Sequence, residues 1–314
     1  MTYKKRLYIL IGLTAVLALL YTGGLVFNSD FAARRSFYVW LDAKTSEKTT
    51  RIVINNSHMG EYEILKQDNL WFVLHDDKVY PARQIRVQDF FDALSVRAAW
   101  SVRSSSASSH ERFGLDDHAS RVTVYVDNSV ILDLLVGDDD VIRNETYFRK
   151  FGQNEVRSGD SSVKTYINNH PGNWYNLRLI TGTDGEAVDI NSVQRVSVQL
   201  PDESQVFSRR NRSWVVSGVE ITNPDIPAVE NYIRVILNTE GDGFSDSVSW
   251  EDTRLDYSRI ALELGYGKII TIRLSAGDEN GRVFAHVSGN DYIYSIPSWA
   301  AQRLYQPAES FEIR

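Results

Sequence analysis

The stretch RVTVYVDNSVILDLLV, residues 121–136, decides the fold. Apolar and polar side chains alternate along residues 121–126, a period of two that is typical of half-buried β-strands, and residues 130–136 form a short apolar run interrupted only by Asp133, which is also consistent with a strand. Asp127 and Asn128 stand between the two runs, and both residue types tolerate the positive φ of a tight turn. The stretch therefore predicts an antiparallel hairpin.

The same pattern occurs again later in the chain, where residues 259–264 and 269–274 predict a second hairpin with a turn at 265–267. Other landmarks recur in the same order. The matching segments are 51–54 with 195–198, 69–73 with 212–216, 114–116 with 254–256, 134–138 with 274–278, and 175–178 with 311–314. No single match is convincing, but their common order indicates one unit written twice.

Each unit contains the same predicted elements. It opens with three short strands, at 51–55, 61–66 and 71–74 in the first copy and at 195–200, 205–209 and 214–216 in the second. A helix follows, because Val87, Phe90, Phe91 and Leu94 fall at the spacing of one buried helix face, as do Val229, Tyr232, Ile233 and Ile236. The serine-rich residues 101–109 predict an exposed loop. Further strands are expected at 147–151, 155–157, 283–287 and 292–296, and short closing helices at 163–168 and 298–305.

These elements predict an α+β fold, in which an N-terminal transmembrane helix precedes two tandem, similar, mostly antiparallel sheet units that each carry one main helix. A parallel sheet is disfavoured, because it would need more crossover helices than the pattern contains. The predicted divisions are residues 1–36 for the cytoplasmic N-terminus, anchor and juxtamembrane segment, 37–180 for the first unit, 181–187 for a linker and 188–314 for the second unit.

The predicted anchor runs from Leu7 to Phe27 and contains no charged residue, a length that suffices for a helix to cross a bilayer core. The basic residues Lys4, Lys5 and Arg6 precede it, so the positive-inside rule places the N-terminus in the cytoplasm and the body outside, although Arg34 and Arg35 weaken this asymmetry. We expect a single-pass protein of the cytoplasmic membrane. The alternative is a signal peptide cleaved after residues 22–24, but its apolar core would be unusually long.

Composition narrows the possible partners. The 314 residues carry a net charge of −7 and include no cysteine, which excludes a disulfide framework and a lipid-modified cysteine. No basic run follows the juxtamembrane arginines. Nucleic acid is therefore not an expected partner, since phosphate binding needs clustered lysine and arginine.

Four features together resemble a bacterial family, the domain of unknown function 4340 family. They are Trp71, the helix that bears Phe90 and Phe91, the phrase FGLD at 113–116, and the Gly137-Asp138 turn. Members of that family have an N-terminal anchor, a Trp-bearing strand, a helix, a phrase like "yGLD" and a strand that ends near "lG". The second copy reads Arg254-Leu255-Asp256 and lacks the glycine. The resemblance implies an accessory role beside gliding-type ABC transporters, a permease complex as membrane-protein partner, and no established catalytic residue.

The segment HERFGLDDH, residues 110–118, contains the candidate metal ligands His110, Asp116 and His118. Their spacing does not support a rigid site, and the second copy replaces both histidines, so we expect no metal and no cofactor. Residues 137–140, GDDD, lack the glycine and glutamate of an EF-hand and are interpreted as an acidic turn.

Eight large apolar side chains are interpreted as core residues of the repeat, because they occupy matching places in the two copies. They are Trp71, Phe90, Phe91 and Leu115 in the first copy and Trp214, Tyr232, Ile233 and Leu255 in the second.

The sequence contains no nucleophile elbow, no cysteine nucleophile and no complete phosphate loop. We therefore expect a non-enzymatic, extracytoplasmic interaction or accessory protein of an ABC-type transport or gliding-like complex. Two other hypotheses stay open. One is a cell-envelope hydrolase with Glu111 and Asp116 as paired carboxylates. The other is a ligand-binding receptor that uses the groove between the two units.

Overall fold

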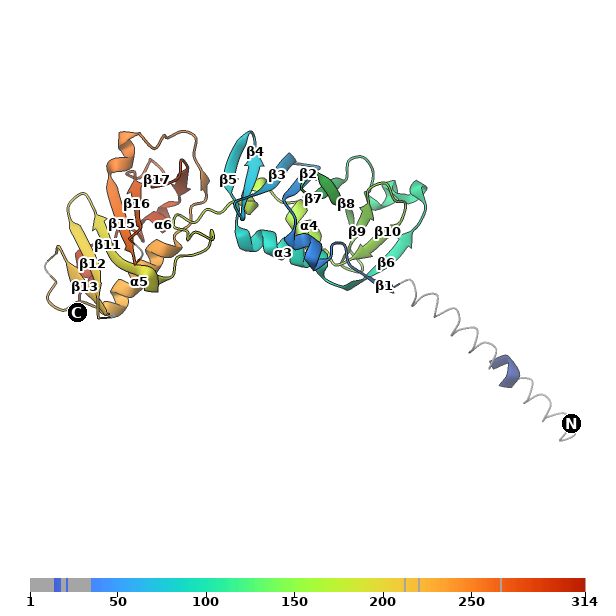
Figure 1. Ribbon diagram of the computed structural model, residues 1–314, viewed down its shortest axis with the longest axis horizontal. Helices are drawn as coiled ribbons and strands as arrows, with labels where there is room; N and C mark the ends of the chain where they lie inside the picture. The colour runs from blue at the N-terminus through green and yellow to red at the C-terminus, as the bar shows by residue number, and fades with distance from the viewer. Residues whose placement is uncertain are drawn as a thin grey trace, which may run out of the picture. The chain divides into compact units, whose positions relative to one another are not determined.

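A computed structural model describes residues 14–17, 21, 35–211, 213–219, 221–265 and 267–313. The described chain forms two compact units (Figure 1). The first contains the described residues up to Val79 together with Ile85–Asn173, and the second contains Tyr80–Gln84 and the described residues from Trp174 onward. The boundary between the units therefore lies before the predicted linker at 181–187. Leu179 and Ile180, which the sequence assigned to the first unit, are buried in the core of the second.

The first unit is built on a ten-stranded sheet whose strand order is β1-β6-β10-β9-β8-β7-β2-β3-β4-β5. Its strands are β1 (Arg35–Tyr38), β2 (Arg51–Asn56), β3 (Gly60–Gln67), β4 (Leu70–His75), β5 (Lys78–Pro81), β6 (Ala98–Ser104), β7 (Ser120–Val126), β8 (Ser129–Asp140), β9 (Glu145–Lys150) and β10 (Val156–Gly159). Every pairing from β1 to β4 is antiparallel.

Three helices accompany this sheet, α2 (Ala43–Glu47), α3 (Gln84–Ser95) and α4 (Ser162–Ile167). The predicted spacing of the main helix is confirmed, since α3 buries Val87, Phe90, Phe91 and Leu94. The core also contains Trp100, which meets Trp40 and Phe148 edge to face at ring-centroid distances of 5.2 Å. Gly159 leaves room for this indole, because a Cβ there would lie 2.3 Å from the Trp100 ring.

The second unit is built on an eight-stranded antiparallel sheet with the order β13-β12-β11-β15-β16-β17-β18-β14. Its strands are β11 (Val193–Gln199), β12 (Ser204–Arg210), β13 (Ser213–Ser217), β14 (Gly243–Phe244), β15 (Ser258–Leu264), β16 (Ile269–Leu274), β17 (Val283–Val287) and β18 (Ile293–Ile296). Its helices are α5 (Ile226–Asn238) and α6 (Ser298–Ala301). The predicted face of α5 is buried, with Leu237 added to it.

The two sheets have the same strand order over eight strands. The first reads β4-β3-β2-β7-β8-β9-β10-β6, and the second reads β13-β12-β11-β15-β16-β17-β18-β14, with the main helix at the same point of the chain order. Strands β1 and β5 are additions at the two edges of the first sheet. The fold is therefore mostly antiparallel sheet with few helices.

Two local predictions are wrong. Residues 101–104 of the predicted serine-rich loop belong to β6, because Trp100 is 2% exposed and the strand finds backbone partners in both β1 and β10. The acidic segment 137–140 is not a simple turn, since β8 continues through it to Asp140 with a register shift between Val136 and Asp139.

The predicted anchor, Leu7 to Phe27, lies outside the described residues except for 14–17 and Tyr21, which are helical, and so do Lys4, Lys5 and Arg6. Among the described residues, no helix has both the length and the apolar character needed to cross a membrane.

Candidate functional site

The FGLD phrase packs against the last part of β8. Gly114 has a φ of +62° and ends the short 3-10 turn Glu111–Phe113, a left-handed conformation that glycine adopts without strain. Leu115 is fully buried beside Leu135 and Val156. A Cβ on Gly137 would lie 2.2 Å from the carbonyl oxygen of Phe113, so these two backbones touch. The FGLD phrase thus packs the segment before β7 against β8 and has a structural role.

The register shift in β8 is fixed by α4 and β9. The Lys164 ammonium donates to the Gly137 carbonyl at 3.0 Å and pairs with the Asp139 carboxylate at 3.0 Å. The Thr146 hydroxyl donates to Asp139 at 2.6 Å. Burial raises the pKa of Asp139, but the hydrogen bonds from Thr146 and Lys164 outweigh it and hold the pKa below its usual value. The strand is therefore locked just before the hairpin turn.

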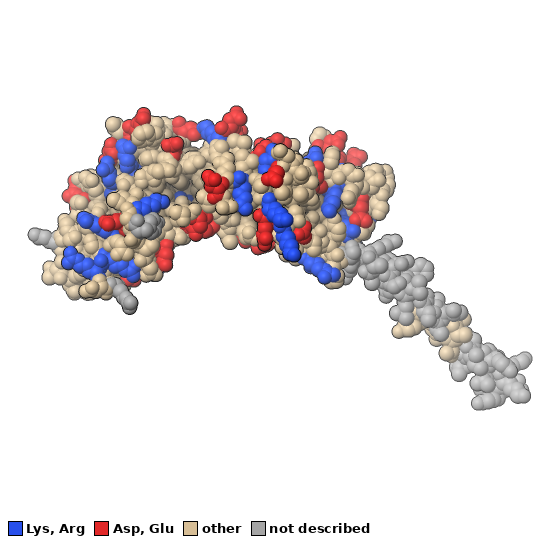
Figure 2. All heavy atoms as spheres, in the orientation of Figure 1, with Lys and Arg blue, Asp and Glu red and all other residues tan. Residues whose placement is uncertain are grey.

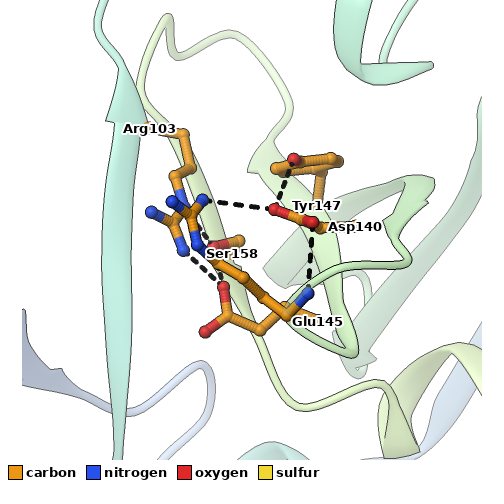
Figure 3. Close-up of polar contacts among 6 residues, drawn as sticks. Arg103, Asp140, Glu145, Tyr147 and Ser158 are labelled. Atoms are coloured by element: carbon orange, nitrogen blue, oxygen red, sulfur yellow. Dashed lines mark hydrogen bonds and ion pairs between the residues drawn. The ribbon is translucent and has the colours of Figure 1, made fainter.

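That turn, residues 141–144, presents two aliphatic side chains to solvent. Val141 is 90% exposed and Ile142 is 96% exposed. Just before them in the chain, Asp140 accepts hydrogen bonds from the Tyr147 hydroxyl at 3.1 Å and from the Arg143 guanidinium at 3.2 Å (Figure 3). We call Val141 and Ile142 the hairpin tip. It is an apolar projection next to Asp140, whose carboxylate is already held by Tyr147 and Arg143.

A second polar cluster braces the same hairpin from the neighbouring strands (Figure 3). Arg103 of β6 donates to Glu145 of β9 and to the hydroxyl of Ser158 of β10, both at 2.5 Å. The Ser158 hydroxyl donates in turn to Glu145 at 2.6 Å. Burial raises the pKa of Glu145, but the hydrogen bonds from Ser158 and Arg103 prevail and lower it. Ser158 is fully buried, so it braces the strands and faces no substrate.

The predicted residues Asp116 and His118 line two adjoining hollows in the first unit, of about 470 and 490 Å³. The hollows share Ser57, His58 and Ala119 as well. The cations around them already have partners, since Arg121 is held by Asp133 and Arg149 donates to the carbonyl oxygens of Leu115 and Gln153. The lining is thus polar and of mixed charge.

The candidate metal ligands have separate roles. Asp116 accepts a hydrogen bond at 2.9 Å from the backbone N–H of His118, which closes a local turn. His110 lines neither hollow, and its Nε2 lies 3.1 Å from the carbonyl oxygen of Asn154. Within the ranges that the structure describes, no three histidine or acidic side chains converge as a metal site would require. Glu111 is exposed and also lines neither hollow, so nothing here pairs it with Asp116.

Seven of the eight proposed repeat-core residues are buried, namely Phe90, Phe91, Leu115, Trp214, Tyr232, Ile233 and Leu255. Trp71 is only partly buried. Its ring lies 5.8 Å from that of Phe91, and the Lys66 ammonium lies 5.7 Å from its centroid. Trp71 thus lies at the border of the core, next to Phe91 of α3.

Sequence reasoning missed the hairpin tip. The signal available was the pair Val141-Ile142 between three aspartates and Arg143-Asn144, where an apolar pair has no core to enter. On the face drawn in Figure 2, acidic and basic side chains are interspersed over each unit. No patch of one charge therefore marks a further candidate site on that face.

A comparison with protein families identifies the family to which the chain belongs. Residues 71–228 match the model of a domain of unknown function, DUF4340. The matched segment begins in β4 and ends in α5, so it includes the FGLD phrase, Gly137 and the hairpin tip. No curated protein matches the chain, and no solved structure does. The match spans half of the chain, and the protein therefore belongs to the DUF4340 family.

Proposed function

We propose that this protein is a non-enzymatic interaction module, tethered to the cytoplasmic membrane with its body outside, that serves as an accessory of an ABC-type transport or gliding-like complex. The uncharged stretch from Leu7 to Phe27 behind Lys4, Lys5 and Arg6 supports the tether. One observation carries the interaction role, which is the exposed hairpin tip on its braced base.

The energetics favour a docking role for the tip. Burial of an aliphatic side chain of this size stabilises a complex by about 1.5–3 kcal/mol. The bonds to Asp140 and Glu145 already order the hairpin, so a partner would not bear the entropic cost of ordering a loop. A partner with an apolar recess would thus gain most of the burial energy of Val141 and Ile142.

The shared strand order supports a further part of the proposal, that the body arose by duplication of one sheet-and-helix module. The two copies then diverged at this hairpin. Its counterpart in the second unit, between β16 and β17, reads SAGDENGR at 275–282 and contains no large apolar residue. Only the first copy therefore carries the tip.

The test is site-specific photocrosslinking in living cells. A photoreactive amino acid at position 142 of the full chain should form a discrete adduct with a membrane protein, and mass spectrometry should identify it as an ABC permease. The matched control is position 269, because Ile269 is also an exposed aliphatic residue, 62% exposed, on the other unit.

Two results would contradict the proposal. One is no protein adduct from position 142 above the level from position 269. The other is an adduct that persists at the same yield when the probe stays at 142 and Val141→Ser and Arg143→Ser remove the flanking contacts, since a specific docking surface depends on its neighbours.

A further inference from the structure

A groove in the second unit lies between α5 and α6 and has a volume of about 420 Å³. Four residues of α5 line it. The three polar ones, Asn231, Arg234 and Asn238, are spaced by three and four and so lie on one outward face of the helix, and the fourth is Val235. Trp299 of α6 and Arg303 beyond it form the opposite side. The opposite face of α5 is buried, whereas Asn231, Arg234 and Asn238 are exposed and take no part in the core.

Trp299 is a fixed aromatic platform. It is 65% exposed, although the next two residues, Ala300 and Ala301, are buried in the core and hold α6 in place. The π-face of its indole carries partial negative charge and therefore favours partly positive C–H groups of a ligand.

The backbones of Arg234 and Arg303 take part in hydrogen bonds, but their guanidinium groups have no hydrogen-bond or ion-pair partner among the described residues. Arg234 exerts only a longer-range attraction on Asp189. The one acid in the lining, Glu240, is already held by Arg83 at 2.9 Å and by Arg178 at 3.2 Å. The groove therefore offers two guanidinium groups to an anion.

The first unit shows that the shared fold does not require this surface. When Phe90 of α3 is aligned with Tyr232 of α5, Asp89 and Asp92 occupy the places of Asn231 and Arg234. When the buried Val163 of α4 is aligned with Ala300 of α6, Tyr166 occupies the place of Arg303.

Tyr166 is committed to packing in the first unit. Its ring lies 5.7 Å from that of Phe90, and the Arg86 guanidinium lies 5.1 Å from its centroid. In the same alignment Ser162 occupies the place of Trp299, so at these positions only the second unit has the positive charge and the exposed indole.

We infer that the α5–α6 groove of the second unit binds an acidic saccharide. A sugar ring stacks on Trp299, its carboxylate or phosphate accepts hydrogen bonds from Arg234 and Arg303, and the Asn231 amide bonds a hydroxyl. The volume falls in the range of small-ligand sites, roughly 300–1,000 Å³. The inference uses no residue of the hairpin tip, so it stands or falls separately from the accessory role.

The test is a calorimetric titration of the full chain in phosphatidylcholine nanodiscs. The probes are a trisaccharide of galacturonic acid, a glucose phosphate, the neutral trisaccharide maltotriose, and inorganic phosphate. Whichever acidic sugar binds more tightly should have an affinity at least about tenfold higher than that of maltotriose, because a hydrogen bond to a charged group increases affinity by that factor. The tighter of the two acidic probes identifies carboxylate or phosphate as the group recognised.

Variants separate the groove from the rest of the surface. Trp299→Ala and the double variant Arg234→Gln, Arg303→Gln should each weaken binding about tenfold or more. The matched controls Trp250→Ala and Arg259→Gln also alter exposed residues of the second unit, outside the groove, and should leave the affinity unchanged. The inference is overturned if no saccharide binds, if maltotriose binds as tightly as the acidic sugars, or if binding survives Trp299→Ala.

Discussion

At the scale of single residues, Gly137 shows how the FGLD phrase is coupled to β8. A methyl group at this position would meet the Phe113 carbonyl and the Leu115 side chain, and neither can move without displacing a buried residue. We predict that Gly137→Ala lowers the free energy of unfolding of the first unit by about 1–3 kcal/mol, the usual cost of overpacking. Amide hydrogen exchange, which resolves the two units separately, measures the loss.

Gly243→Ala is the matched control, because a Cβ at Gly243 has no atom within 4 Å and that residue also lies in a strand. It should leave exchange unchanged or slow it slightly. Equal exchange in wild type and Gly137→Ala would show that the two backbones do not touch in solution.

Glu145 gives the brace beneath the hairpin tip a pH dependence. Its pKa is lower in the folded state than the ordinary value of 4.5, so its contribution is fully present above about pH 4.5 and is lost as the pH falls through the folded pKa. We predict that Glu145→Gln lowers the stability of the first unit by about 1–2 kcal/mol at pH 7, a range reduced because the carboxylate is a quarter exposed. The difference from wild type should shrink below pH 4.5, as hydrogen exchange at several pH values can show.

Glu309→Gln serves as the comparison, since Glu309 is an exposed glutamate of the second unit. The stability of Glu309→Gln should equal that of the wild type across the same pH range. A difference for Glu145→Gln that stayed constant down to pH 3 would mean that packing, and not the charge, matters at this position.

Single residues also mark the limit of what the sequence could predict. Leu115 and Leu255 were recognisable as core residues because each recurs at the same place in the two copies, and both are buried. The roles of Ser158 and Glu145 depend on strands far apart in the chain, β6, β9 and β10, which only the folded sheet brings together. The hollows beside His118 and Asp116 are likewise lined by residues that are far apart in the chain and meet only in the folded unit.

At the scale of elements, the strands and helices with a strong period were predictable and those without one were not. The hairpins β7–β8 and β15–β16 and both main helices lie where the pattern placed them. Strand β6 was hidden by its serines, because polar residues suffice for a strand that gains its backbone bonds from two neighbours and buries mainly Trp100. Strand β14 consists of two residues, too few to show any period.

Helix α5 begins with a cap that can be tested by itself. The Asp225 side chain accepts a hydrogen bond from the backbone N–H of Ala228 at 3.1 Å. We predict that Asp225→Ala destabilises the helix by about 1 kcal/mol, the usual cost of a lost cap, and speeds amide exchange in the first turns of α5. Asp225→Ser keeps an acceptor and should retain most of the protection. Similar exchange for the two variants would show that the cap does not stabilise α5.

At the scale of the whole molecule, duplication accounts for the common strand order better than separate origins of two sheets, because eight strands and one helix recur in the same succession. The sequence repeat indicated this from a handful of short matches. It could not indicate the additions β1 and β5, which have no counterpart in the second sheet. The hairpin tip and the α5–α6 groove likewise lie where the copies differ, outside the shared core.

The proposed membrane tether leads to a last prediction, which the absence of cysteine makes easy to test. Thr2→Cys and Ile269→Cys each introduce a unique thiol, the first before the basic residues and the second on the exposed face of β16. If the positive-inside rule holds, a membrane-impermeant maleimide should label Ile269→Cys in intact spheroplasts and label Thr2→Cys only after the membrane is permeabilised. The opposite pattern would show that the N-terminus lies outside the cell and the body in the cytoplasm. A body released into the supernatant without its N-terminus would instead identify residues 7–27 as a cleaved signal, because only an uncleaved helix keeps Thr2 and Ile269 in one membrane-bound chain.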